Sequence, residues 1–442
     1  MKKEAKKYVD GYKAFLTEAK TERRAYAATV RLLEKAGFRE LKGAKRLKAG
    51  DKVWRGYHGK TLFAAVIGRE GTSAGVRVVG GHTDAPRLDL KPKPLYEKGD
   101  ITFFDTHMYG GIKKYQWLVL PLALYGTVAK KDGTRVEVSI GDAPSDPVFM
   151  ISDILPHFGK EQLDKKVKDA VAAEDMDVIA GLGKIEDLLK DKYGIEKDDL
   201  LSAELEIVPA GAPRDVGLDR ALVAAYGHDD RVCAYVGLAA LIDVAGAKGA
   251  PARTCAVVLC DKEEIGSVGA SGMDSSFFEN SIAELIDHEG GNARDIDVRR
   301  ALEASQMLSA DVCAASDPHF PDADSTGNES RLGKGPCMIK YTGPAAKSGA
   351  NDARAEFIAA LRRILDDAGV TWQMGELGRA EKGGGGTIAK FMARFGMDVI
   401  DFGTPLLNMH APWELASAED CWNTNRAYRA FFEASAAALK ID

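Results

Sequence analysis

The sequence has little of what marks a secreted, membrane-spanning or nucleic-acid-binding protein. Only six of its 442 residues are cysteines, and no two have C-x-x-C spacing, so we expect buried, reduced thiols and a cytoplasmic location. The longest apolar run, residues 117–129, contains a proline and is too short to cross a bilayer. The lysine-rich start is interrupted by acidic residues and is not typical of a signal peptide. The whole chain has 60 basic and 66 acidic residues and a net charge of -6. This charge argues against a protein that binds nucleic acid through its phosphates.

The remaining composition is that of a large globular protein. Hydrophobic residues make up 45% and charged residues 29% of the chain, enough for a large core without disulfides. Helical spacing of apolar side chains predicts helices in the first 60 residues, and two apolar runs at 62–67 and 76–79 predict strands. Between residues 92 and 216, alternating apolar and polar residues are typical of antiparallel strands. The charged stretch 160–199 inside this region is predicted to form an exposed helical excursion.

After residue 217, predicted helices alternate with apolar strands such as 255–260 and 397–402. This alternation predicts an α/β fold with a mostly parallel central sheet and helices on both faces. The simplest arrangement is a discontinuous domain, residues 1–91 and 217–442, interrupted by an inserted β-rich domain at 92–216.

The chain has only eight histidines, so the residues beside them are informative. His82 and Asp84 end a predicted strand, and residues i and i+2 of an extended segment point to the same side. His82 can therefore bind a metal while Asp84 steadies the ring; for this pair alone, a hydrogen-bonded histidine is the alternative. In Gly-His-Asp-Asp, one of the two carboxylates can bridge two metal ions, or the two acids can simply begin a helix. The residues alone leave open whether the bridging carboxylate is Asp229 or Asp230.

Three further positions offer metal or acid–base chemistry. Glu263 and Glu264 follow a buried strand, where one can bind a metal and the other can take a proton from water; the alternative is a charged turn. Asp311 follows another short apolar run, and it can equally be a helix or turn acid. His410 directly follows Met409 and lies two residues before Pro412, and for a lone histidine near such residues a packed side chain is the usual explanation.

Taken together, these groups predict a metal site. Two histidines and three or four carboxylates follow separate strands of one presumed sheet, whose carboxyl ends form a shared crevice. Histidine and carboxylate ligands without cysteine suit zinc, manganese or cobalt. Two metal ions need about five such ligands, one of them bridging, and the inventory leaves one glutamate over as a base.

The motifs also resemble those of the aspartyl aminopeptidase family, within the wider group of co-catalytic zinc aminopeptidases. The resemblance rests on five segments in order: GGHTDAPRLDLKP, GHDDRVCA, CDKEEIGS, LSADVCAA and TPLLNMHAPWE. It implies a peptidase domain interrupted by a β-rich dimerisation domain. It also implies a large homo-oligomer, often a dodecamer, that acts on peptides with a free N-terminus and uses two divalent metal ions, zinc foremost with cobalt or manganese as alternatives.

The resemblance assigns a role to each candidate residue. His82 and Asp311 would bind the first metal, Glu264 and His410 the second, and Asp229 both. Asp84 would orient His82, and Glu263 would be the general base that takes a proton from metal-activated water and passes it to the leaving amine.

The resemblance also bears on the substrate side chain. Lys340 matches the family's basic residue for acidic side chains, although an exposed strand lysine is the simpler interpretation. Gly385, in a run of four glycines, lets backbone N–H groups approach a substrate, or it belongs to a plain flexible loop. Tyr115 stands where better-known members carry a histidine that reaches a neighbouring subunit's active site. This departure puts strict Asp/Glu preference in doubt and leaves the metal site unaffected.

Two alternatives accompany the aminopeptidase hypothesis. A related metal-dependent amidohydrolase or deacylase would act on N-acylated substrates instead of free N-termini. A non-catalytic oligomeric scaffold would bind metal without turnover, but the complete ligand set and the spare Glu263 argue against it.

Overall fold

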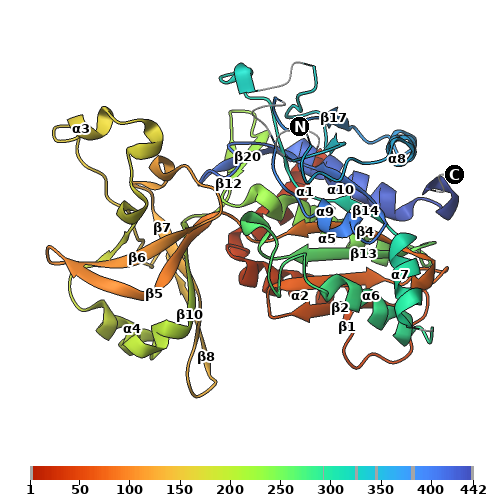
Figure 1. The fold of residues 1–442 in the computed structure, drawn as a ribbon, viewed down its shortest axis with the longest axis horizontal. Coiled ribbons are helices and arrows are strands. Elements are labelled where there is room, and N and C mark those ends of the chain that lie inside the picture. The colour runs from red at the N-terminus through yellow and green to blue at the C-terminus, as the bar shows by residue number, and fades with distance from the viewer. Residues whose placement is uncertain (1–2, 292, 324–326, 344–346, 380–383, 440–442) are drawn as a thin grey trace.

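The computed structural model describes residues 3–291, 293–323, 327–343, 347–379 and 384–439. These residues form a larger lobe built on a nine-stranded sheet, a smaller lobe built on a six-stranded sheet, and a five-stranded sheet (Figure 1). The predicted α/β class is therefore observed as a mixed α/β fold with several sheets.

The nine-stranded sheet is parallel in its centre and mixed at its edges. In order across the sheet, its strands are β1 (Arg39–Glu40), β2 (Lys52–Tyr57), β3 (Thr61–Val66), β13 (Thr254–Cys260), β4 (Val76–His82), β14 (Gln306–Ser309), β18 (Asp398–Gly403), β16 (Cys337–Ile339) and β17 (Gln373–Gly375). Neighbouring strands from β13 to β18 are parallel, whereas β3 pairs antiparallel with both β2 and β13. The expected mostly parallel sheet is thus correct for the centre. The β2–β3 pair differs because its three-residue connection permits a hairpin but not a crossover.

Helices cover both faces of this sheet, as predicted. One face is covered by α1 (Lys3–Glu18), α2 (Glu22–Lys35), α5 (His228–Gly246), α8 (Ala355–Asp367) and α10 (Ala418–Glu433), and the other by α6 (Phe277–His288), α7 (Asp295–Glu303) and α9 (Ala389–Ala393). Alternate residues of β13 enter the two cores, Val257 one and Val258 the other, as the two-residue period of a strand requires. No helix in the described ranges is both long and apolar enough to span a membrane.

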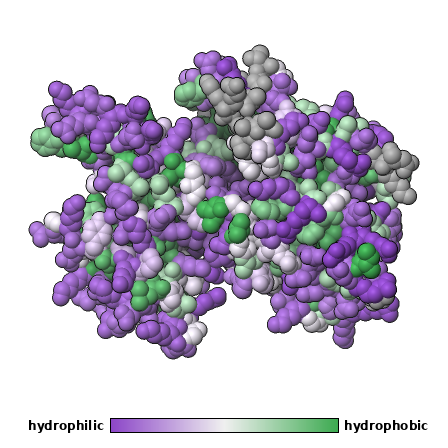
Figure 2. All heavy atoms as spheres, in the orientation of Figure 1, coloured by the Kyte–Doolittle hydropathy of each residue, from purple (hydrophilic) through white to green (hydrophobic). Residues whose placement is uncertain are grey.

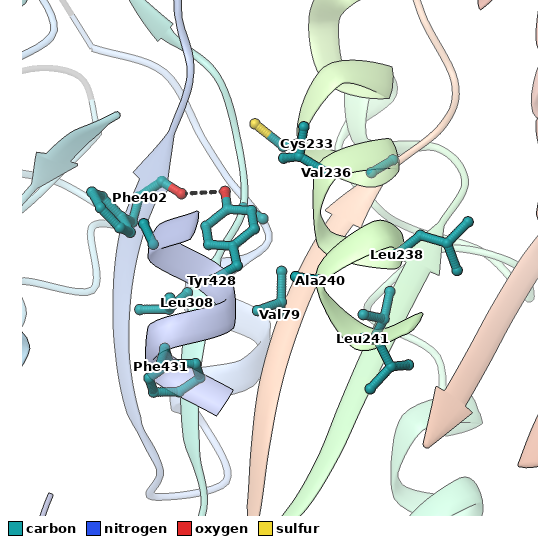
Figure 3. Packing of buried hydrophobic residues seen from close by; sticks show 14 of the residues in the cluster. Val79, Cys233, Val236, Leu238, Ala240, Leu241, Leu308, Phe402, Tyr428 and Phe431 are labelled. Carbon is teal, nitrogen blue, oxygen red and sulfur yellow. Dashed lines mark hydrogen bonds between the residues drawn. The ribbon is translucent and has the colours of Figure 1, made fainter. Parts of the chain in front are cut away.

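Figure 3 shows the packing under α5 and α10. Val79 of β4 lies between the two helices, and Tyr428 of α10 donates a hydrogen bond of 2.6 Å to the Phe402 carbonyl of β18. These contacts fix the helices over the central strands whose ends carry the candidate site.

The smaller lobe has its own antiparallel sheet and core. Its strands, in order, are β8 (Arg135–Ile140), β7 (Leu122–Ala129), β10 (Ala203–Pro209), β5 (Arg87–Lys98), β6 (Ile101–Tyr109) and β9 (Val178–Gly181). A separate cluster of buried side chains, including Trp117 and Leu124, fills this lobe. The stretch 160–199 is less helical than expected, because β9 and a turn with positive-φ glycines separate α3 (Lys160–Leu163) from α4 (Ile185–Tyr193).

The third sheet consists of β11 (Arg214–Val216), β12 (Leu222–Ala225), β20 (Glu414–Ser417), β19 (Pro405–Leu407) and β15 (Cys313–Ala314). In Figure 1, β12 and β20 lie where the two lobes meet. The N-terminal prediction is partly wrong, since helix formation stops at Lys35 and β1 and β2 follow before residue 60. A left-handed Gly37 (φ 85°) redirects the chain there.

Candidate metal centre

Three neighbouring strands of the large sheet deliver acids and a histidine to one edge. His82 is the last residue of β4, Glu263 and Glu264 lie in a short 3-10 turn after β13, and Asp311 follows β14. Because β13, β4 and β14 are adjacent and parallel, their carboxyl ends bring these side chains together.

Asp229 and His410 reach the same place from a different sheet. Asp229 follows β12, and His410 lies in the loop between β19 and β20. The expectation that one sheet carries all candidates is therefore corrected. After β18 the chain leaves the large sheet and enters β19 of the five-stranded sheet.

The candidates form two groups of three that share Asp229. In the first, His82 Nε2 lies 3.3 Å from Asp229 Oδ1 and 4.0 Å from Asp311 Oδ1. In the second, His410 Nε2 lies 3.3 Å from Asp229 Oδ2 and 3.5 Å from Glu264 Oε2. Within each group the ligand atoms are all within 4.8 Å of one another. Asp229 thus offers one oxygen to each group, and Glu263 belongs to neither.

Asp84 and Asp230 occupy the rear of the site. Asp84 Oδ1 is 3.3 Å from His82 Nδ1, the ring nitrogen that faces away from Asp229 and Asp311. The same carboxylate accepts the backbone N–H of Glu263 and of Glu264. Asp230 is fully buried and accepts the backbone N–H of His82 at 3.2 Å. The two adjacent aspartates therefore differ in place: Asp229 faces both imidazoles, and Asp230 supports the end of β4.

One residue of this site was missed by the sequence reasoning. Glu414 of β20 is buried and accepts the backbone N–H of Asp229 at 3.0 Å and of His410 at 2.7 Å. It lies four residues after His410, inside the segment TPLLNMHAPWE. That spacing places it near His410, but nothing local in the sequence indicates its contact with Asp229.

The electrostatics of these groups show an excess of buried negative charge. Burial raises the pKa of Glu263 to about 7, with the neighbouring carboxylates of Asp229 and Asp84 adding to the shift. Burial also raises the pKa of Asp311 and of Glu264 well above the usual range. For His410, burial lowers the pKa, but Asp229 and Glu264 outweigh it and raise the pKa to about 10. Cations at this place would relieve the repulsion among the carboxylates.

The side chains present fit divalent metal ions. Glu264 Oε1 is buried and has no hydrogen-bond partner among the described residues, so it is an oxygen available for a ligand. Two imidazole nitrogens and three carboxylates are the donor types that zinc binds in catalytic sites. The groups therefore can hold one ion each, with Asp229 between them.

A cavity of ≈450 Å³ opens onto the two groups. Residues 384–386, including the predicted Gly385, line it, whereas Gly383 lies outside the described residues. Lys340 does not line it; its Nζ points to Asp352, 4.0 Å away. Tyr115 is 45% exposed on a 3-10 turn (Lys114–Trp117) and does not line it either.

Comparisons with known proteins identify the family of this chain. The family described as Aminopeptidase I zinc metalloprotease (M18) matches residues 15–432. A relative from Clostridium acetobutylicum named probable M18 family aminopeptidase 1 is 46% identical over 96% of this chain and 93% of its own. The chain belongs to the M18 family. The crystal structure of an M18 aminopeptidase from Thermotoga maritima is 40% identical, with a TM-score of 0.94 over 98% of this chain and 97% of that one.

A more distant structure extends the likeness in fold. The Saccharomyces cerevisiae mApe1 dodecamer is 20% identical, with a TM-score of 0.78 over 97% of this chain and 96% of that one. Membership of the M18 family makes this protein a hydrolase, a metal-dependent aminopeptidase of a zinc family. The family-level resemblance is confirmed, and the deacylase and scaffold alternatives are not favoured.

Proposed function

We propose that this M18 enzyme removes single N-terminal residues with two metal ions held by the two groups. One ion would be bound by His82, Asp229 and Asp311, and the other by Asp229, Glu264 and His410. The observation that carries the proposal is that Asp229 places one oxygen 3.3 Å from each imidazole. Zinc is the ion that the family description implies, with cobalt and manganese as substitutes.

Glu263 and Asp84 supply the proton transfer and the positioning that the reaction also needs. Bound divalent ions lower the pKa of water and polarise a carbonyl. Glu263, whose carboxylate is outside both groups and borders the cavity, takes the proton from the attacking water and passes it to the leaving amine. Asp84 holds the backbone of Glu263 and the ring of His82 in place. The free amino terminus of the substrate lies beside the carboxylates, which favours removal of one residue over internal cleavage.

The cavity suits an uncharged, apolar N-terminal side chain. Its walls carry Val312, Ile339, Leu377, Phe391 and Met409. They also include the buried carboxyl of Asp401, which in its ionised form disfavours a second carboxylate. The predicted preference for Asp and Glu rested on the family resemblance and on Lys340, which does not line the cavity. Lys390 does line it, so that lysine is the one to substitute if acidic substrates prove to be preferred.

A substrate panel tests this proposal. Zinc-loaded protein is assayed on leucyl, alanyl, lysyl, aspartyl and glutamyl nitroanilides, with N-acetyl-leucyl nitroanilide as the control for a free amino terminus. We expect leucine to be cleaved fastest, the acetylated substrate to be inert, and chelation to abolish turnover until zinc is restored. Fastest cleavage of aspartate, lost in Lys340→Met but kept in Lys390→Met, would instead support the Lys340 prediction.

We further propose that residues 92–216 are an inserted domain through which the chain forms a homo-oligomer, with residues 1–91 and 217–442 forming the catalytic domain. Most of the large hydrophobic side chains that are exposed in the described chain lie in this stretch, including Phe158 and Leu163, 74% and 76% exposed. Figure 2 shows hydrophobic residues at the surface of the smaller lobe, and exposed apolar side chains that are concentrated in one part of a chain favour an interface there.

Light scattering after size-exclusion chromatography tests the assembly. A mass near twelve chains is expected for the wild type, and Phe158→Asp is expected to give smaller species. A monomeric wild type would contradict the proposal. A cytoplasmic location stays a prediction; it is supported by six cysteines that are all free and buried.

A further inference from the structure

One segment of the smaller lobe touches the surroundings of both candidate histidines. Tyr109 ends β6, and its hydroxyl donates a hydrogen bond of 2.9 Å to Asp84 Oδ2. The other carboxylate oxygen of Asp84, Oδ1, lies 3.3 Å from His82 Nδ1, and the Asp84 backbone carbonyl lies 3.1 Å from the same nitrogen. Two residues later, the Gly111 carbonyl lies 2.9 Å from His410 Nδ1 and accepts its N–H. The segment 109–111 therefore contacts, directly or through one carboxylate, the rear nitrogen of each imidazole.

The backbone at Gly110 and Gly111 lies close to Glu264 and His410. Gly110 has φ 73°, and a Cβ on it would lie 3.3 Å from Glu264 Cβ. A Cβ on Gly111 would lie 3.5 Å from His410 Nδ1. A left-handed glycine at 110 thus allows the chain to turn close enough for the Gly111 carbonyl to reach His410.

The ring of Tyr109 packs against the guanidinium group of Arg87. The ring is buried, and the Arg87 guanidinium lies 3.9 Å from the ring centroid. Arg87 is in turn fixed by the buried carboxylates of Glu22 at 3.1 Å and Glu206 at 3.4 Å. Because the ring is clamped by a buried ion-pair network, its hydroxyl has a defined direction toward Asp84.

We infer that the segment Tyr109–Gly111 is a positioning element of the metal centre: it orients both ligand histidines and thereby sets how tightly the two ions are held. The inference rests on the proposed ligand sets. A metal-binding histidine depends on the group that binds its second nitrogen, because that group fixes the ring and its tautomer. The smaller lobe then contributes to the metal centre of its own chain, separately from any role in assembly.

Tyr109→Phe tests this inference, since it removes the hydroxyl and keeps the ring against Arg87. Metal-free protein is titrated with zinc in competition with a chromophoric chelator. We expect two bound ions in the wild type, and in the variant an affinity about 10–100-fold weaker for one of them. The visible spectrum of cobalt-loaded protein should change as well, because the coordination of His82 is perturbed. A role in folding alone would leave both readouts unchanged.

The matched control is Tyr96→Phe, which removes the same kind of contact elsewhere on the sheet. Tyr96, on β5, donates to Asp177 Oδ2 at 2.5 Å, and its loss should leave zinc affinity and the cobalt spectrum as in the wild type. Gly110→Ala is a second variant, expected to weaken the ion held by Glu264 and His410. Should Gly110→Ala fail to fold, Tyr109→Phe still decides the matter.

The outcomes separate this inference from the proposed function. Zinc affinity within twofold of the wild type and an unchanged cobalt spectrum in Tyr109→Phe would overturn the positioning role and leave the ligand sets intact. Two ions bound with full affinity in His82→Ala would instead refute the ligand sets, whatever Tyr109→Phe shows.

Discussion

Replacing Glu263 by glutamine separates proton transfer from metal binding. Glutamine keeps the size of the side chain and loses its ability to accept a proton. The backbone of residue 263 stays fixed, because its N–H is bound by Asp84 at 3.2 Å. The carboxylate belongs to neither three-residue group, so zinc content should stay at the wild-type value. Losing a general base typically lowers the rate by about 10²–10⁴-fold, which corresponds to a barrier roughly 3–5 kcal/mol higher.

The assay measures kcat and KM on leucyl nitroanilide together with bound zinc per chain. We expect the loss to appear in kcat, with KM changing little, because the substrate contacts in the cavity are unchanged. Glu186→Gln, on the exposed helix α4, is the matched control and should have wild-type kinetics. A fully zinc-loaded Glu263→Gln enzyme with near-normal kcat would refute the base role. Loss of zinc in the variant would show instead that Glu263 is a ligand.

Three further predictions concern groups around the site and the core. Arg77→Met should destabilise the fold by about 3 kcal/mol in urea unfolding, because the buried guanidinium donates to four carbonyls at the end of α10; an unchanged midpoint would contradict this. For Glu22, burial raises the pKa, but its arginine and lysine partners outweigh it and hold the pKa well below the ordinary value. Its stabilisation is therefore present above the unfolded pKa of about 4.3 and is lost as the pH falls. The stability gap between wild type and Glu22→Gln should be constant above about pH 5 and should narrow progressively as the pH falls below the unfolded pKa of about 4.3; a gap that stays constant in this acidic range would refute the assignment. Glu414→Gln should weaken zinc binding about 10–100-fold. The carboxylate accepts one backbone N–H on each of its two oxygens, whereas an amide has only one oxygen. Unchanged zinc affinity would show that these contacts are dispensable.

The sequence was most informative where a site residue directly follows a strand of the large sheet. The buried run before His82 has nothing but apolar residues and glycine after Arg77, and the run before Asp261 is apolar throughout. Such runs predict central parallel strands, and polar residues at their ends then predict the crevice. His82, Glu263 and Glu264 could be placed together in this way, because each position depends on the strand that it ends.

The contacts that complete the site depend on pairs of residues far apart in the chain. Glu414 meets Asp229 across 185 positions, and the Gly111 carbonyl meets His410 across 299. Hydrophobic periodicity describes one element at a time and carries no information on such pairs. For the same reason the sequence could not show that strands of a second sheet position Asp229 and His410.

The supports behind the ligands come from different sheets, and this bears on how the centre is assembled. Asp84 follows β4 of the large sheet, Glu414 belongs to β20 of the five-stranded sheet, and Tyr109 ends β6 of the smaller lobe. Each binds a backbone N–H or a ring nitrogen of a candidate ligand, directly or through one carboxylate. The geometry of the two groups is therefore defined only when all three sheets are in place. A substitution that loosens the junction of the lobes, far from any ligand, should then weaken metal binding before it weakens the core of either lobe.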